Sequence, residues 1–191
     1  MIQLEKDREY TVEEYVSMLK DSAEKLEYHA GKVVAMAGAS PNHNTIKSNT
    51  YLYLGNQLAA GCRPFDSDTA IAIAESNRYL FPDMSFLCGE DPRFDEGGLA
   101  LLQNPALIIE VLSPGTEAYD RGEKFRYYRS LPSFREYVLI QSEKYSVEVF
   151  QREEADLWHI RSAYQRDQSV WLETLGLELS LEKVYQWVEF S

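Results

Sequence analysis

The chain has 191 residues, of which 45% are hydrophobic and 26% are charged, so it has enough apolar sequence to bury a substantial core. Its 31 acidic residues outnumber its 19 basic residues and give a formal net charge of −12, which argues against a generic basic nucleic-acid-binding protein. A local basic face or bridging divalent cations would still allow such a chain to bind a polyanion.

Targeting signals and cysteine pairs are not apparent in the sequence. The first eight residues, MIQLEKDR, are charged and lack the apolar core of a signal peptide, and no later segment is apolar enough to span a bilayer. We therefore expect a soluble cytoplasmic protein without membrane association. Cys62 and Cys88 lie 26 positions apart, a spacing that indicates neither a disulfide scaffold nor a zinc knuckle, so both are expected to be buried small apolar residues.

The N-terminal part of the chain predicts two helices and a strand. Thr11 begins a Thr-x-x-Glu capping box, and apolar residues then recur at helical spacing as far as Leu26. A strand is expected at 32–37, after Gly31. A second helix is expected to begin near Asn42 and to end at Gly61.

Three strand-like runs follow, at 69–74, 84–88 and 106–112. The third run is almost entirely apolar, which indicates a central strand covered on both faces. A helix is expected between Thr116 and Pro132, followed by another buried strand at 136–140. This strand–helix–strand order predicts a parallel pair joined by a right-handed crossover.

The C-terminal part predicts an antiparallel extension of the same sheet. Apolar and polar residues alternate at 147–150 and at 157–160, and a short final helix is expected from Ser180 to Trp187. The expected fold class is therefore α/β, with a mixed central β-sheet flanked by helices.

Glu110 is the most informative candidate site residue, because it interrupts an apolar run. A carboxylate inside a covered strand costs free energy unless a cation or hydrogen bonds compensate its charge. The alternative is that Glu110 lies at an exposed strand end and accepts backbone hydrogen bonds from the turn at Ser113.

Asp83 and Lys124 carry weaker signals. Asp83 follows Pro82 directly before a predicted strand, where its side chain could point into a cleft, although a Pro-Asp pair is more often a turn. Lys124 follows Glu110 by 14 positions, in the helix that a crossover packs back over the sheet. The alternative is that Lys124 is an ordinary solvated helix lysine that pairs with Asp120 at i−4.

Together, two carboxylates and an ammonium group suit phosphodiester hydrolysis. Asp83 and Glu110 would hold Mg²⁺ or Mn²⁺, which lowers the pKa of bound water and offsets charge on phosphate oxygens. Lys124 would orient or deprotonate the attacking water or stabilise developing negative charge, and the sequence does not distinguish these roles. A glycosidase pair of carboxylates is an alternative that the lysine disfavours.

An ordered series of short motifs, between about Tyr10 and about Phe150, resembles one nuclease family. The motifs are Pro82-Asp83, the run from Ile109 to Thr116, the run from Asp120 to Lys124, and Glu136-Tyr137. They are similar to the Uma-two-type restriction endonucleases of the PD-(D/E)XK superfamily.

This resemblance implies a single restriction-endonuclease-like domain over residues 1–191, with a nuclease-like core at about 10–150 and C-terminal strands and a helix at about 151–191. It also implies DNA as the substrate, Asp83 and Glu110 as metal ligands, the Val111 carbonyl as a third ligand, and Lys124 as the catalytic lysine. Replacing Lys124 is then expected to abolish cleavage and leave the fold intact.

One position departs from the pattern of the superfamily, which has a lysine two residues after the acid, where this chain has Leu112. Lys124 would therefore be a relocated lysine. Glu27, expected at the end of the first helix, resembles an extra helix acid that some members add to the site, and His43 opens the second helix. A lone glutamate on a helix is usually solvated, however, and a lone histidine is usually a cap or a surface residue.

Two functions from different classes follow. The first is a Mg²⁺- or Mn²⁺-dependent DNA endonuclease, and the second is a catalytically silent nuclease-fold protein that binds another protein, which the charge of −12 and the displaced lysine favour. A homodimer is expected by analogy.

Overall fold

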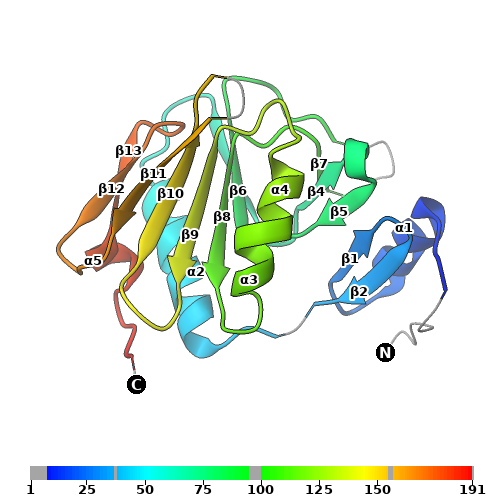
Figure 1. Cartoon of the computed structure of the whole chain (residues 1–191), viewed down its shortest axis with the longest axis horizontal. Helices are drawn as coiled ribbons and strands as arrows, with labels where there is room; N and C mark the ends of the chain where they lie inside the picture. The colour runs from blue at the N-terminus through cyan, green and yellow to red at the C-terminus, as the bar shows by residue number, and fades with distance from the viewer. Residues whose placement is uncertain (1–7, 37, 95–99, 155–156, 191) are drawn as a thin grey trace.

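The computed structural model describes residues 8–36, 38–94, 100–154 and 157–190, which form helices packed on two β-sheets and a hairpin (Figure 1). In spatial order, the larger sheet of this described part contains β11 (Trp158–Ala163), β10 (Val147–Arg152), β9 (Glu136–Gln141), β8 (Leu107–Leu112), β6 (Met84–Cys88) and β3 (Cys62–Asp66). Strands β8 and β9 are parallel, and the other neighbours are antiparallel. The sheet is therefore mixed, as predicted.

A smaller sheet and a hairpin complete the β structure of the described residues. In spatial order, the smaller sheet contains β2 (Lys32–Ala35), β1 (Leu26–His29), β5 (Arg78–Leu80), β4 (Ala70–Ile73) and β7 (Leu101–Leu102). The hairpin consists of β12 (Ser169–Leu172) and β13 (Leu177–Ser180).

The helical elements of the described residues are α1 (Val12–Asp21), α2 (Pro41–Gly55), α3 (Glu117–Tyr119), a π-helical turn (Asp120–Lys124), α4 (Phe125–Tyr128), α5 (Leu181–Val184) and a short 3₁₀ turn (Ala74–Ser76). Helices α2 and α5 pack on one face of the larger sheet and α4 packs on the other, whereas α1 packs against the smaller sheet. Helices α3 and α4 and the turn between them form the crossover from β8 to β9. Figure 1 shows α1, β1 and β2 at one end of the molecule, away from β11 and the hairpin.

Two helix starts follow from their capping residues. The Thr11 hydroxyl accepts a hydrogen bond from the Glu14 backbone N–H at 3.2 Å, and the Glu14 carboxylate accepts one from the Thr11 N–H at 2.9 Å. These bonds confirm the predicted capping box. Helix α2 begins with Pro41 after Ser40, whose hydroxyl accepts a hydrogen bond from the backbone N–H of His43 at 3.2 Å.

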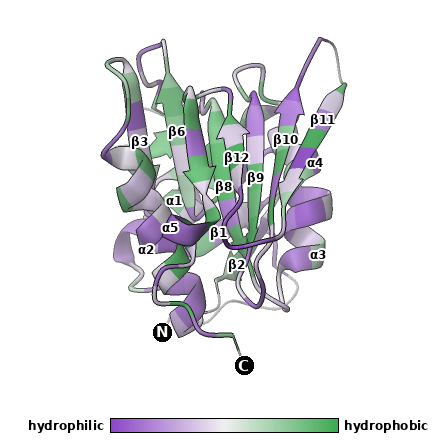
Figure 2. Ribbon diagram, turned by 90° about the vertical axis from the view of Figure 1, so that its left-hand side faces the viewer, coloured by the Kyte–Doolittle hydropathy of each residue, from purple (hydrophilic) through white to green (hydrophobic). Residues whose placement is uncertain are grey.

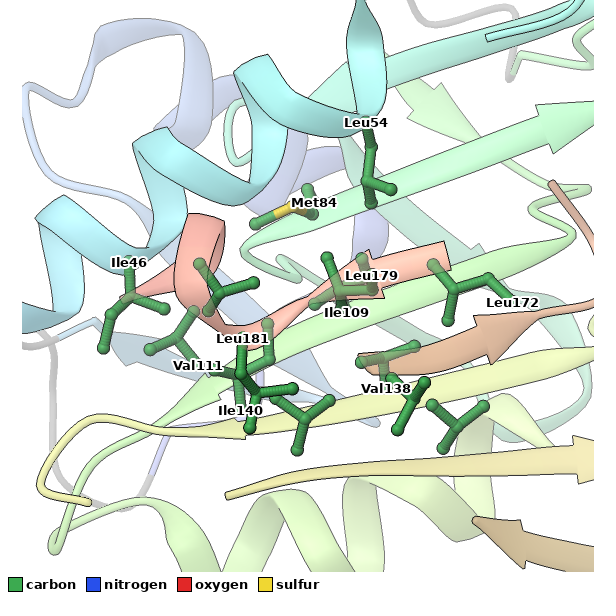
Figure 3. Packing of buried hydrophobic residues seen from close by; sticks show 14 of the residues in the cluster. Ile46, Leu54, Met84, Ile109, Val111, Val138, Ile140, Leu172, Leu179 and Leu181 are labelled. Carbon is green, nitrogen blue, oxygen red and sulfur yellow. The ribbon is translucent and has the colours of Figure 1, made fainter. Parts of the chain in front are cut away.

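The two faces of β8 pack into different cores. On one face, side chains of β6, β8 and β9 meet apolar residues from α2, the hairpin and α5 (Figure 3). The labelled contributors are Ile46, Leu54, Met84, Ile109, Val111, Val138, Ile140, Leu172, Leu179 and Leu181. On the other face, Ile108 and Leu112 pack with Tyr128 of α4 and Tyr137 of β9. Glu110 belongs to this second face because side chains alternate along a strand.

Hydropathy follows this arrangement. Figure 2 shows hydrophobic residues along much of the strands of the larger sheet, whereas hydrophilic residues are prominent on α2 and α3. Within the described part of the chain, we find no helix of the length and apolar character needed to cross a membrane.

Several predicted element boundaries are wrong. Helix α1 ends at Asp21 because the Ser22 hydroxyl bonds locally, accepting from the Glu24 N–H at 2.9 Å and donating to the Glu24 carbonyl at 2.8 Å. Leu26 therefore begins a strand. Helix α2 ends at Gly55 rather than Gly61.

Other expected elements are shorter, longer or interrupted. The expected strand at 32–37 ends at Ala35, and position 37 lies outside the described residues. The expected helix after Thr116 is interrupted by the π-helical turn. The expected strand at 157–160 runs from Trp158 to Ala163, and the final helix ends at Val184, before Trp187.

The cysteine prediction is also wrong. Cys62 and Cys88 form a disulfide bond, and both residues are half-buried rather than buried. Strands β3 and β6 are antiparallel and place these two residues directly opposite each other, with their Cα atoms 4.1 Å apart. Strand pairing therefore brings together two cysteines that lie 26 positions apart in the sequence.

Candidate functional site

Asp83 lies directly before β6 and connects three elements. Its Oδ2 accepts a hydrogen bond from the Val111 backbone N–H at 2.8 Å, at the end of β8, and lies 3.1 Å from Nε2 of His43 in α2. Burial raises the pKa of Asp83, but the contacts with His43 and Val111 and the charge of Lys124 outweigh burial and lower this pKa. The alternative that Pro82-Asp83 is only a turn is wrong, because the Asp83 carboxylate accepts a hydrogen bond from β8, a strand distant in sequence.

Glu110 is buried in the middle of the sheet, with only 4% of its side chain exposed. Its Oε1 lies 2.7 Å from Nζ of Lys124 and accepts a hydrogen bond from the Tyr128 hydroxyl at 3.3 Å, while its Oε2 accepts one from the Asp83 N–H at 3.3 Å. Burial raises the pKa of Glu110 well above its usual value, because the attraction of Lys124 does not offset burial and the nearby charges of Asp120 and Asp83. The alternative that Glu110 lies at an exposed strand end is therefore wrong.

Lys124 lies at the end of the π-helical turn and points into the same cluster. Besides Glu110, its Nζ donates to the Phe81 carbonyl at 3.2 Å and lies 3.6 Å from Asp120 and 3.9 Å from Glu27. Its side chain is 5% exposed, so the alternative of a solvated lysine is wrong. Burial alone would lower the pKa of Lys124, but the three acids raise it well above its usual value.

Glu27 joins the cluster from a strand and not from a helix. It lies on β1, where its Oε1 accepts a hydrogen bond from the Phe81 N–H at 2.9 Å and its Oε2 lies 3.2 Å from Nε2 of His29. Burial raises the pKa of Glu27, but Lys124, His29 and the Phe81 N–H outweigh burial and lower it. The prediction that Glu27 lies at the end of a helix is therefore wrong. Its carboxylate is nevertheless close to Lys124.

His43 uses its backbone and its side chain for different purposes. The backbone N–H bonds to the capping residue Ser40, while the side chain turns toward Asp83. Its Nδ1 is buried and has no hydrogen-bond partner among the described residues. His43 therefore orients the Asp83 carboxylate and is not a simple surface histidine.

Asp120 is a member of the cluster that the sequence did not single out as a site residue. It is buried, and burial raises its pKa above the usual value despite the nearby charge of Lys124. The signal available in the sequence was its i−4 spacing from Lys124, which is also typical of ordinary surface pairs. Burial of both partners is a tertiary property.

The cluster contains more acids than bases. Asp83, Glu110, Glu27 and Asp120 are largely buried; Lys124 contacts Glu110, Glu27 and Asp120, and His43 contacts Asp83. A buried excess of carboxylates costs free energy unless some are protonated or a cation is bound. The raised pKa of Glu110 has burial as its main cause and is consistent with this excess of acids.

The donor set is chemically suitable for a hard divalent cation. Carboxylate oxygens of Asp83 and Glu110 are the ligands that Mg²⁺ and Mn²⁺ prefer. Because the Val111 N–H points to Asp83, the Val111 carbonyl is expected to point to the same side of its strand. Within the described ranges, however, no three His, Cys, Asp or Glu side chains converge as a metal-binding group on their own. A cation here would need further ligands from water or substrate.

Comparisons with known proteins place this chain in a family. The model of the family described as "Uma2: Putative restriction endonuclease" matches residues 12–182. Two similar proteins come from Synechocystis sp. (strain ATCC 27184 / PCC 6803 / Kazusa): the uncharacterized protein slr1290 is 35% identical over 93% of this chain and 92% of its own length, and the uncharacterized protein sll1609 is 37% identical over 74% of this chain and 80% of its own length.

A solved structure shares the fold. It is described as a putative nuclease belonging to DUF820 from Anabaena variabilis ATCC 29413, and it matches with a TM-score of 0.67 at 18% identity, covering 91% of this chain and 98% of that chain. The match confirms the predicted α/β fold with a mixed sheet flanked by helices. Given the family match over most of its length and the identity to slr1290, the chain belongs to the Uma2 family of restriction-endonuclease-like proteins.

Proposed function

We propose that this chain is a divalent-metal-dependent endonuclease that hydrolyses phosphodiester bonds in DNA, with Asp83, Glu110 and Lys124 at its centre. One observation carries the proposal: three residues from separate segments meet in one buried cluster, in which Lys124 lies 2.7 Å from Glu110 and the Asp83 N–H bonds to Glu110 at 3.3 Å. The family and the fold support nuclease activity.

Asp83, Glu110 and the Val111 carbonyl would hold Mg²⁺ or Mn²⁺. When bound, the cation would lower the pKa of a bound water and offset negative charge on the phosphate. Mg²⁺ sites commonly use one or two carboxylates, with waters and substrate phosphates as the remaining ligands. The absence of a third acidic ligand among the described residues is compatible with such a site.

Lys124 would stabilise negative charge rather than abstract a proton. Because its pKa is raised well above the usual lysine value, Lys124 carries its charge at neutral pH. A charged ammonium group can orient the attacking water and donate hydrogen bonds to the phosphate oxygens as negative charge develops. Asp120 and Glu27 would hold Lys124 in place, and His43 would hold Asp83.

The proposal is tested by calorimetric titration of Mn²⁺ and Mg²⁺ into the wild type and into the Asp83→Ala and Glu110→Ala variants. We expect each variant to lose affinity by more than about 100-fold, because losing an outer-shell partner alone typically costs 10–100-fold. Asp91→Ala is the control, since that carboxylate is 97% exposed. The titration is repeated with a DNA duplex, which supplies phosphate ligands, and plasmid cleavage is measured in parallel. Unchanged binding and cleavage in both variants would contradict the proposal.

A catalytically silent protein-binding module is the second candidate. The short contact between Lys124 and Glu110 favours it, because the ammonium group occupies part of the coordination capacity of that carboxylate. No metal binding and no cleavage by the wild type, with or without DNA, would support this candidate and exclude the endonuclease.

We further propose that the protein is cytoplasmic and, by analogy, that it is a homodimer. Light scattering on the purified chain is expected to give a mass of about twice the 22.0 kDa of one copy. A mass equal to one copy at micromolar concentration would rule out the dimer.

A further inference from the structure

Two lysines from different segments converge on Ser67. Nζ of Lys25 donates hydrogen bonds to the Ser67 carbonyl at 2.7 Å and to its hydroxyl at 2.8 Å, and Nζ of Lys47 reaches the same hydroxyl at 3.4 Å. Two ammonium groups that bind the same hydroxyl repel each other, so their convergence has an electrostatic cost. Asp68 pairs with Lys25 at 2.7 Å and offsets part of this cost, but the Asp68 side chain is 76% exposed.

Strand pairing places this cluster beside Asp83. In the antiparallel pair of β3 and β6, Asp66 is opposite Met84. Ser67 directly follows β3 and Asp83 directly precedes β6, so both residues are next in sequence to this last pair of the ladder. The lysines are thus adjacent to the proposed centre and not on a remote surface.

Each lysine is also connected to the centre through its own element. Lys25 directly precedes β1, which carries Glu27, and Lys47 lies one helical turn after His43 on α2. A hollow of about 320 Å³ is lined by Lys25, Asp68 and Phe81, among others. The backbone of Phe81 binds both Glu27 and Lys124, so this hollow adjoins the buried cluster.

We propose that Lys25, Lys47 and Ser67 form a subsite that binds a backbone phosphate of DNA next to the scissile bond. This inference rests on the proposed endonuclease function. A chain of net charge −12 with buried acids at its centre repels a polyanion, so substrate binding needs local positive charge at this place. Lysine ammonium groups and a serine hydroxyl are common partners of phosphate oxygens.

Asp68 does not prevent phosphate binding at this subsite. An exposed ion pair such as Lys25–Asp68 contributes little to stability, so a phosphate can displace the carboxylate at small cost. The two ammonium groups would then share an anion between them, which removes the repulsion present in the free protein.

The test is fluorescence anisotropy of a labelled 20-base-pair DNA duplex in buffer containing Ca²⁺, between 50 and 200 mM NaCl. We expect Lys25→Gln/Lys47→Gln to weaken binding more than about tenfold at 50 mM salt and to reduce the salt-dependence slope by about two. The control is Arg63→Gln/Arg93→Gln, which removes the same charge from exposed side chains near the opposite end of β6. The control is expected to bind within about twofold of the wild type.

The outcomes separate this inference from the function on which it rests. The subsite is ruled out if the lysine double variant binds DNA as well as the wild type does. It is also ruled out if both double variants weaken binding equally. Neither result contradicts the proposed endonuclease function. A wild type that neither binds nor cleaves DNA would overturn the proposed function itself. If the double variant melts early by circular dichroism, Lys47→Gln alone, which removes a single 3.4 Å contact, is expected to reduce the slope by about one.

Discussion

Replacing Lys124 with methionine is expected to abolish DNA cleavage and to lower the free energy of unfolding by about 3–5 kcal/mol at pH 7. Methionine keeps most of the side-chain volume but removes the charge that contacts Glu110 at 2.7 Å, Asp120 at 3.6 Å and Glu27 at 3.9 Å. Three buried acids would then lack their shared cation. From the sequence alone, Lys124→Ala is expected to leave the fold intact, whereas the buried cluster predicts that loss of this charge destabilises the fold.

The measurement combines urea unfolding with plasmid cleavage, both at a temperature where the variant is still folded. Lys183→Met is the matched control, because Lys183 is exposed on α5 and its replacement is expected to change stability by less than about 0.5 kcal/mol. A Lys124→Met variant as stable as this control would show that Lys124 does not compensate the acids. Full cleavage by the folded variant would exclude Lys124 from the mechanism.

Replacing Glu110 with glutamine is expected to abolish cleavage and to preserve or increase stability. The glutamine amide keeps the shape and removes a carboxyl group whose charged form is disfavoured by burial, while Lys124 retains Asp120 and Glu27 as partners. Loss of this carboxylate, which we propose as a metal ligand, should reduce cleavage by at least about 100-fold. Glu110→Gln is thus expected to lose cleavage but not stability, whereas Lys124→Met is expected to lose both.

The stability effect of Glu110→Gln should depend on pH. The folded-state pKa of Glu110 is raised by burial, so the stability linked to this carboxyl group is complete below its unfolded pKa of about 4.3 and is lost as pH rises through the folded pKa. Glutamine does not titrate. The stability of Glu110→Gln relative to the wild type should therefore increase from pH 4 to pH 8, by on the order of 1 kcal/mol or more.

Urea unfolding in the presence of a chelator measures this difference without a bound cation. Glu117→Gln is a suitable control, because Glu117 is half-exposed at the start of α3 and its pKa is lowered by Arg121. A stability difference for Glu110→Gln that falls with rising pH would contradict the raised pKa.

Covered strands and capped helices were well predicted from local patterns. Strand β6 was predicted with its observed bounds, and β8 and β9 differ from the predicted strands by one residue each. Strands buried on both faces read as continuous apolar runs, and a capping box depends on residues within one helical turn. Such signals do not require knowledge of the rest of the chain.

Other strands were missed because their local sequence does not show an alternating or continuous apolar pattern, and pairing with other strands stabilises them. β3 contains Pro64 and is stabilised by pairing with β6, while β1 lies within a helical apolar spacing but pairs with β2 and β5. The disulfide between Cys62 and Cys88 was missed for the same reason. Strand pairing is a long-range contact that local propensity does not encode.

For the candidate site, the sequence by itself determined the residue types and their order: Asp83 before a strand, Glu110 inside an apolar strand, and Lys124 in the crossover helix. The tertiary structure decided that these side chains meet, that Glu27 reaches them from β1, and that Asp120 is buried beside Lys124. It also decided that His43 contacts Asp83 and that Lys25 and Lys47 converge on Ser67. The physical reason is that burial and charge pairing depend on distances between segments, which only the packed fold establishes.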